Sequence, residues 1–180
     1  MKVYDCFMYY DEQTVVDIRL NCLDAHVDKF VIVENKFTHS GKKRDLLFDI
    51  NKFKNFKEKI IYLIIDHEPR GIETIDHEDD ESAKSFKSIE NAIRRENYHR
   101  NYIGRGLTDA DEEDIIMISD ADEIPNLENL NIKKIKNKLI FFNQKMFYYK
   151  LNLHLDSFNW CGSKACRKKN LISPQWLRNI

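Results

Sequence analysis

The sequence lacks any apolar run long enough to cross a bilayer, and its N-terminus lacks the hydrophobic stretch of a secretory signal. It also lacks internal repeats and low-complexity linkers. We therefore expect a soluble, cytoplasmic protein whose 180 residues form one compact domain. A composition that is 42% hydrophobic and 12% aromatic supports a folded core and argues against a disordered chain.

An excess of one charge sign and abundant cysteine are absent as well. The 29 basic and 30 acidic residues leave a net charge of −1, so neither nucleic acid nor an anionic membrane is an expected partner. Four cysteines are too few for a disulfide scaffold. Cys6 and Cys22 lie in segments of apolar periodicity and are predicted to be buried thiols. Cys161 and Cys166 lack the His or Cys partners that a zinc site needs.

The sequence does contain apolar runs of β-type character that alternate with segments carrying helical signals. Four runs are predicted as strands, at residues 2–10, 29–35, 59–66 and 115–118. Two later aromatic segments, 138–144 and 145–154, are predicted as further strands that pair antiparallel with each other. Near-continuous apolar strands that alternate with helices indicate an α/β fold with a mostly parallel sheet covered on both faces.

Helices are predicted in three places. The first follows Asp11, its expected N-cap, and its apolar face is formed by Val15, Ile18, Cys22 and Leu23. A short helix is compatible with residues 46–59, and a long helix is predicted from residue 82 to about residue 107.

A carboxylate lies in or just after each of the four apolar runs. These acids are Asp5, Glu34, Asp66 and Asp120. In a parallel sheet the carboxyl ends of the strands lie at one edge, where ligands bind, so we expect the acids to gather along one rim. For Asp66 a plain loop position is favoured.

The segment "DIIMISDADEIP", residues 114–125, runs from a buried strand directly into three acids within four positions. Carboxylates this close repel one another, so a positive partner is expected among them. Mg²⁺ and Mn²⁺ prefer carboxylate oxygens and keep positions open for phosphates. Asp120 and Asp122 are therefore predicted to face one such ion, which would stabilise the departing diphosphate of a nucleotide-sugar donor.

The chain resembles glycosyltransferase family seventeen. The similar stretches are "DCFMYYDE", "DIRL", "VDKFVIVENKFTHSGK", "RRENYHRNYI", "DIIMISDADEIP", "FYYKLN" and "WCGS", in the family's order over nearly the whole chain. The resemblance implies a nucleotide-sugar-binding fold of the GT-A type. It also implies an inverting transfer of a sugar, such as N-acetylglucosamine, from a UDP donor to a glycan hydroxyl, assisted by Mn²⁺ or Mg²⁺. The family's catalytic region normally continues beyond Ile180, so the expectation is one catalytic domain, residues 1–180, that lacks the C-terminal part.

The resemblance places the family's D-x-D-E motif on Asp120, Asp122 and Glu123. It implies that Asp120 contacts the ribose or the metal and that Asp122 contacts the metal directly. Glu123 has two possible roles. It could form a hydrogen bond to the donor or acceptor sugar, or it could cap the next helix from its position ahead of Pro125.

Glu34 and a cluster in "RRENYHRN" are the other donor-binding candidates. Glu34 is expected to meet the base or ribose, with a loop ion pair to Lys36 or Lys42 as the alternative. The cluster residues are Arg95, Arg100 and Asn101. A guanidinium matches phosphate geometry, whereas the alternative for Arg100 is a surface pair with Glu96 on the same helix.

Fewer residues of the sequence indicate where the acceptor binds and which group acts as the base. Trp160, beside Gly162, is expected to stack on an acceptor sugar, while the neighbouring aromatic strand residues are assigned to the core. An inverting transfer needs one carboxylate that takes the proton from the acceptor hydroxyl. Asp156 is the first candidate for this base and Glu123 is the second.

Two other functions are compatible with part of this sequence pattern, in which acidic residues follow a buried strand. A phosphatase of the haloacid-dehalogenase type also places D-x-D after a strand, but normally on the first strand and with Thr or Val where this sequence has Ile124. An inactive remnant that binds nucleotides or glycans is the non-enzymatic alternative. Metal-dependent binding of UDP, with or without turnover, distinguishes these hypotheses.

Overall fold

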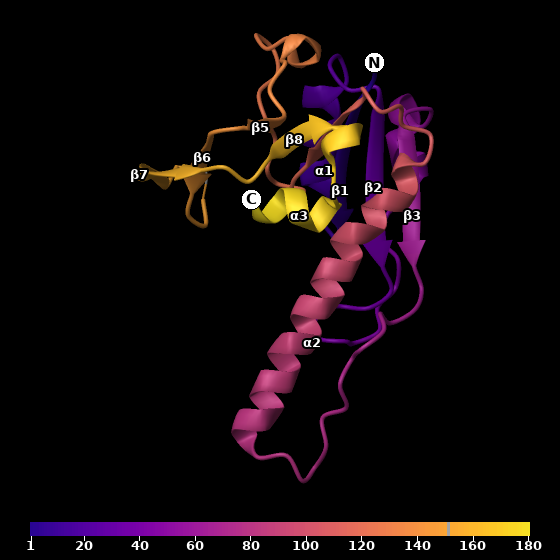
Figure 1. Ribbon diagram of the computed structural model, residues 1–180, viewed down its shortest axis with the longest axis vertical. Helices are drawn as coiled ribbons and strands as arrows, with labels where there is room; N and C mark the ends of the chain where they lie inside the picture. The colour runs from indigo at the N-terminus through magenta and orange to yellow at the C-terminus, as the bar shows by residue number, and fades with distance from the viewer. Residues whose placement is uncertain (151) are drawn as a thin grey trace.

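The computed structural model, which describes residues 1–150 and 152–180, has a six-stranded sheet at its centre (Figure 1). The strand order is β3-β2-β1-β4-β8-β5. Four neighbouring strands run parallel: β1 (Val3–Tyr9), β2 (Lys29–Asn35), β3 (Ile60–Ile65) and β4 (Ile115–Ile118). The edge strands β8 (Lys164–Arg167) and β5 (Leu139–Phe141) are antiparallel to their neighbours. The four predicted strands and the mostly parallel α/β sheet are confirmed, whereas the GT-A type stays a prediction.

Alternate residues of the central strands enter two separate apolar cores, one on each face of the sheet. Phe30 and Ile32 of β2 belong to the core under α1 (Gln13–Leu23), and Val31 and Val33 belong to the opposite core. The opposite face is covered by Leu177 of α3 (Pro174–Asn179) and by the 3-10 segment η2 (Tyr102–Leu107). The prediction of a sheet covered on both faces is therefore confirmed.

The helix α1 is rotated relative to its predicted orientation. It begins after Glu12 rather than capping on Asp11, and it buries Val16, Arg19, Leu20 and Leu23. Cys22, predicted to be buried, is exposed. The helix turns this way because the Arg19 guanidinium is drawn to the buried Asp5 carboxylate on β1, an ion pair that apolar periodicity does not reveal.

The long helix α2 (Glu81–Asn101) links the sheet to a projecting part of the chain. The Asp80 side chain caps it by accepting a hydrogen bond from the backbone N–H of Ala83 at 2.7 Å. Its C-terminal turns pack beside the sheet, and its N-terminal half extends well beyond the body of the protein (Figure 1). The remaining 3-10 segments are η1 (Ile50–Phe56), η3 (Ile132–Lys134) and η4 (Lys168–Asn170).

The late strands pair differently from the prediction. Among the described residues, segments 138–144 and 145–154 do not pair with each other. Instead β5 joins β8 in the main sheet, and β6 (Gln144–Phe147) pairs antiparallel with β7 (His154–Trp160). The two form a separate ribbon at the side of the molecule (Figure 1). β8 was not predicted from the sequence because it is short and polar at both ends, and therefore lacks an apolar run.

Within the described part of the chain, none of the helices combines the length with the apolar character that a membrane span requires.

Candidate active site

The acidic loop, residues 119–123, begins where β4 ends and lies between three cavities. The first, of about 750 Å³, lies beside the ends of β1 and β2. The second, of about 570 Å³, adjoins the β6–β7 ribbon, and the third, of about 420 Å³, adjoins α2 and α3. Asp120 lines all three cavities and Asp122 lines the first two. The D-x-D pair therefore lies at the edge of the sheet where ligands bind in α/β folds.

Arg19 holds the backbone of the acidic loop from below. Its Nη1 donates to the carbonyl oxygens of Asp120 and Ala121, both at 3.1 Å, and of Glu123 at 3.0 Å. Its Nε and Nη2 donate to the Asp5 carboxylate at 2.7 and 2.6 Å, and both side chains are fully buried. Asp5 is therefore beneath the loop rather than on the rim, where we expected it.

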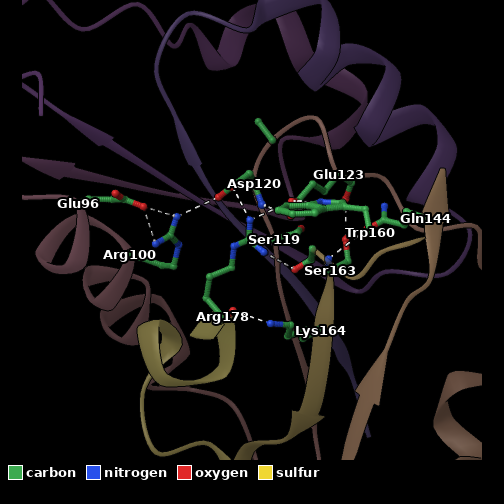
Figure 2. A network of polar contacts seen from close by, with 12 residues as sticks. Glu96, Arg100, Ser119, Asp120, Glu123, Gln144, Trp160, Ser163, Lys164 and Arg178 are labelled. Atoms are coloured by element: carbon green, nitrogen blue, oxygen red, sulfur yellow. Dashed lines mark hydrogen bonds and ion pairs between the residues drawn. The ribbon is translucent and has the colours of Figure 1, made fainter. Parts of the chain in front are cut away.

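Two more arginines neutralise Asp120 from opposite sides. Its Oδ1 accepts from Arg100 Nη2 on α2 at 3.0 Å, and its Oδ2 accepts from Arg178 Nη2 on α3 at 2.8 Å (Figure 2). Burial alone would raise the pKa of Asp120, but the charges and hydrogen bonds of Arg178 and Arg100 outweigh it and hold the pKa below its ordinary value. The positive partners that the acidic sequence requires are thus arginines.

Glu123 closes the loop. It is 8% exposed, and its Oε2 accepts from the Asp120 backbone N–H at 2.9 Å. Its Oε1 accepts from Trp160 Nε1 at 2.7 Å and from Arg178 Nη2 at 2.9 Å (Figure 2). No helix follows at Pro125, so the helix-cap alternative is wrong. A Cβ on Gly162 would lie 1.9 Å from Glu123 Oε1 and 2.4 Å from Trp160 Nε1, so a larger residue here would displace these side chains.

Asp122 is the exposed acid of the loop. Within the described residues its carboxylate makes no hydrogen bond or ion pair, and it lines two cavities. The described residues contain no group of three or more His, Cys, Asp or Glu side chains that could hold a metal ion. Mg²⁺ sites commonly use only one or two carboxylates together with substrate phosphates and water. Asp122 therefore has a carboxylate available to a metal that arrives with a phosphate ligand, whereas Asp120 would first have to leave its two arginines.

Glu34 is fully buried and organises the loop after β2. Its carboxylate accepts from the backbone N–H groups of Leu47 at 2.7 Å and Phe48 at 3.1 Å, and from Tyr62 Oη at 2.6 Å. Its ion pair is with Arg44 at 3.2 Å rather than with either lysine that we considered. It does not line the first cavity. Its contact with a donor stays a prediction.

Arg95 lies under a loop that lines the first cavity. Its Nε donates to Glu68 at 2.9 Å, and its Nη1 donates to the backbone carbonyl of His39 at 3.2 Å. Gly41 has φ 86°, and a Cβ there would lie 2.6 Å from Arg95 Nη2. Arg95 is outside the three cavities, so the structure shows it supporting the loop, and direct donor binding stays a prediction.

Arg100 faces the first and third cavities. Besides Asp120, it contacts Glu96 Oε1 at 3.1 Å and Gln175 Oε1 at 2.6 Å. The predicted pair of Glu96 with Arg100 is therefore present together with the contact to Asp120. Asn101 lies outside the cavities, and its side chain accepts from the Gln175 backbone N–H at 2.9 Å, which ties α3 to α2.

Two histidines line the first cavity. His99 is 5% exposed, and its Nε2 lies 2.9 Å from the Val33 carbonyl oxygen. Burial lowers the pKa of His99 to about 4 and also lowers the pKa of His39. Both rings are therefore neutral at pH 7, and the positive charge at this end of the cavity comes from arginine.

The two acceptor-side candidates occupy different places. Trp160 lines the second and third cavities, and the Arg178 guanidinium carbon lies 5.6 Å from its ring centroid. Asp156 lies on the exposed ribbon, outside all three cavities, where its carboxylate pairs with His154 Nδ1 at 2.5 Å. The role of Asp156 as a base stays a prediction, although its placement does not favour it.

Sequence reasoning missed Arg19 and Arg178. Arg19 falls within the matched stretch "DIRL", and an arginine facing the buried side of a helix was a usable signal for a buried acid. Arg178 had one indirect signal: Ser173 followed by Pro174 predicts the start of a helix that carries it.

The chain belongs to glycosyltransferase family 17, since the model of that family matches residues 1–172. The resemblance stated from the sequence is thereby confirmed. Curated relatives named beta-1,4-mannosyl-glycoprotein 4-beta-N-acetylglucosaminyltransferase, from Homo sapiens and Rattus norvegicus, are each 27% identical over 138 residues. The match covers 74% of this chain and 24% and 23% of those relatives, so the chain spans about a quarter of their length. The comparison with solved structures gave no significant match.

Proposed function

We propose that this chain carries the donor-binding site of a glycosyltransferase that uses a UDP-sugar and a glycan acceptor. The observation that carries the proposal is the position of Asp120 and Asp122, at the junction of the cavities in a family 17 chain. The names of the relatives describe addition of N-acetylglucosamine to a mannosyl glycoprotein, and N-acetylglucosamine is accordingly the proposed sugar.

The donor is assigned to the first cavity. Its volume of about 750 Å³ lies in the range that small-molecule and cofactor sites occupy. Tyr10, which is exposed, offers aromatic surface to a nucleotide there, and His39 and His99 offer neutral polar groups. The diphosphate then lies toward the acidic loop. When bound, a Mn²⁺ or Mg²⁺ ion at Asp122 and Asp120 would neutralise phosphate charge.

The acceptor is assigned to the second cavity, which shares Asp120 and Asp122 with the first. Trp160 offers a ring face for a sugar at its border. In an inverting transfer, the acceptor oxygen bonds to the anomeric carbon as the bond to the diphosphate breaks. The hydroxyl proton passes to a carboxylate. Of the two candidates for that base, only Glu123 lines a cavity.

Calorimetric titration with UDP, with and without Mn²⁺, tests the proposal. We expect metal-dependent binding that Asp122→Asn weakens at least about tenfold, whereas Asp109→Asn, a matched change at an exposed acid, leaves it unchanged. Equal UDP affinity in the two variants would contradict the assignment.

Turnover separates the transferase from its alternatives. Release of UDP from UDP-N-acetylglucosamine supports the transferase, and binding of UDP without release in the presence of glycan acceptors supports a binding remnant. Hydrolysis of p-nitrophenyl phosphate would favour the phosphatase instead.

A further inference from the structure

Two guanidinium groups from different helices converge on a single carboxylate that borders three cavities. Arg100 comes from α2 and Arg178 from α3, and each donates one hydrogen bond to Asp120, at 3.0 and 2.8 Å (Figure 2). The two arginine side chains are 4% and 14% exposed, whereas that of Asp120 is 37% exposed. The carboxylate is thus the accessible member of the cluster, and the arginines lie behind it.

Arg100 also has an unused hydrogen-bond donor. Its Nε is the one buried side-chain nitrogen or oxygen without a partner among the residues that the structure describes. A buried N–H without an acceptor is costly and rare in native proteins, so this donor is available to an oxygen from outside the chain, whether of water or of a ligand. This observation is independent of the contacts to Asp120.

Asp120 is the carboxylate that Arg100 and Arg178 share, and it gives this cluster more negative than positive charges. The arginines Arg100 and Arg178 serve three carboxylates, those of Glu96, Asp120 and Glu123. The histidines of the first cavity are neutral at pH 7 and add no positive charge. A change that removes the charge of Asp120 leaves each guanidinium with one carboxylate partner, Glu96 for Arg100 and Glu123 for Arg178, and frees the donors that now bind Asp120.

We infer that Arg100 and Arg178 form a clamp for a diphosphate, and that Asp120 occupies this clamp in the ligand-free protein. Phosphate oxygens accept from guanidinium groups in the same planar geometry as carboxylate oxygens do. Arg100 lines the first and third cavities and Arg178 lines the third, so a diphosphate that extends from the first cavity past Asp120 offers its two phosphoryl groups to the two arginines. This inference rests on the proposed function for the identity of the donor, but the clamp itself requires only a diphosphate.

The test uses inorganic pyrophosphate as the probe, titrated calorimetrically without metal. Asp120→Asn should bind pyrophosphate about tenfold more tightly than the unaltered protein, because the variant frees both arginines from a competing carboxylate. Arg178→Gln should bind it about tenfold more weakly, and Arg178→Lys should recover part of the loss. A purely structural ion pair predicts no gain of affinity in Asp120→Asn.

Arg105→Gln is the matched control, since Arg105 is exposed and lies away from the cavities. Circular dichroism of each variant verifies that it is folded. Unchanged pyrophosphate affinity in Asp120→Asn and in Arg178→Gln would overturn the clamp, and so would absence of pyrophosphate binding in every folded protein. Binding of pyrophosphate with the expected pattern, but without binding of UDP, would leave the clamp intact and refute the proposed function.

Discussion

At the scale of single residues, buried charge determines how the acidic loop is built. Arg19 is fully buried, and it satisfies both the Asp5 carboxylate and three loop carbonyls. Its partner Asp5 is equally buried. A buried ion pair contributes modestly to net stability, but removal of one partner leaves an uncompensated charge in the interior.

Arg19→Met should therefore lower the free energy of unfolding by about 3–5 kcal/mol in urea denaturation. The double variant Arg19→Met with Asp5→Asn should be less destabilised than the sum of the single variants, because no unpaired charge remains. Arg105→Met at an exposed position should change stability by less than about 0.5 kcal/mol. Strict additivity of the two single changes would contradict a coupled pair.

A second residue-scale prediction concerns pH. His99 has an ordinary pKa of 6.5 that falls to about 4 in the folded protein. Its contribution to stability is complete above pH 6.5 and is lost as the pH falls toward 4, because the unfolded chain takes up the proton first. Relative to His99→Gln, the free energy of unfolding should decrease by roughly 3 kcal/mol at most across this window. Parallel pH profiles for the two proteins would refute this account.

At the scale of elements, the site depends on a tight approach between the chain after β7 and the acidic loop. Gly162 leaves no room for a Cβ beside Glu123 and Trp160, which would lie 1.9 and 2.4 Å from it. Gly104, in η2, has nothing within 4 Å of the same position. These two glycines form a natural pair of test and control.

Gly162→Ala should displace the Trp160 indole from Glu123 and cost about 1–3 kcal/mol of stability. The measurement is tryptophan fluorescence in a Trp176→Phe background, in which Trp160 is the one remaining tryptophan, together with thermal unfolding. Gly104→Ala should leave both readouts unchanged. An unchanged Trp160 spectrum in Gly162→Ala would show that the contact tolerates a methyl group.

Elements also show what could be predicted from the sequence. Continuous apolar runs located β1 to β4, and the acids after β4 located the loop, because both signals are local. The arginine contacts to Asp120 could not be predicted, because they join positions that are distant in the sequence. The β6–β7 pairing was missed because β7 is exposed along most of its length and lacks the apolar run that marks the buried strands. Arg19 and Arg178 meet the acidic loop from segments far away in the chain. Apolar periodicity predicted the wrong buried face for α1. The helix buries Arg19, and Ile18 and Cys22 are therefore exposed.

At the scale of the whole molecule, the site is assembled from nearly every part of the chain. The acidic loop follows β4, one arginine comes from α2 and another from α3, and Trp160 comes from the ribbon (Figure 2). A ligand held by these elements should therefore stabilise the fold as a unit.

Mn²⁺ with UDP at 100 times the dissociation constant should raise the free energy of unfolding by about 2.7 kcal/mol. Differential scanning calorimetry measures this as an increase in Tm. The increase should be lost in Asp122→Asn and retained in Asp109→Asn, which is matched in charge. An equal increase in both variants would place the ligand away from the acidic loop.

Arg19 holds the acidic loop through the backbone of the loop. It binds carbonyl oxygens, which every amino acid possesses, so this support of the turn does not depend on which side chains the turn displays. Evolution, or a protein engineer, could exchange residues 120–122 for others while the scaffold that presents them is inherited intact. New binding chemistry could then arise on this turn without a new fold.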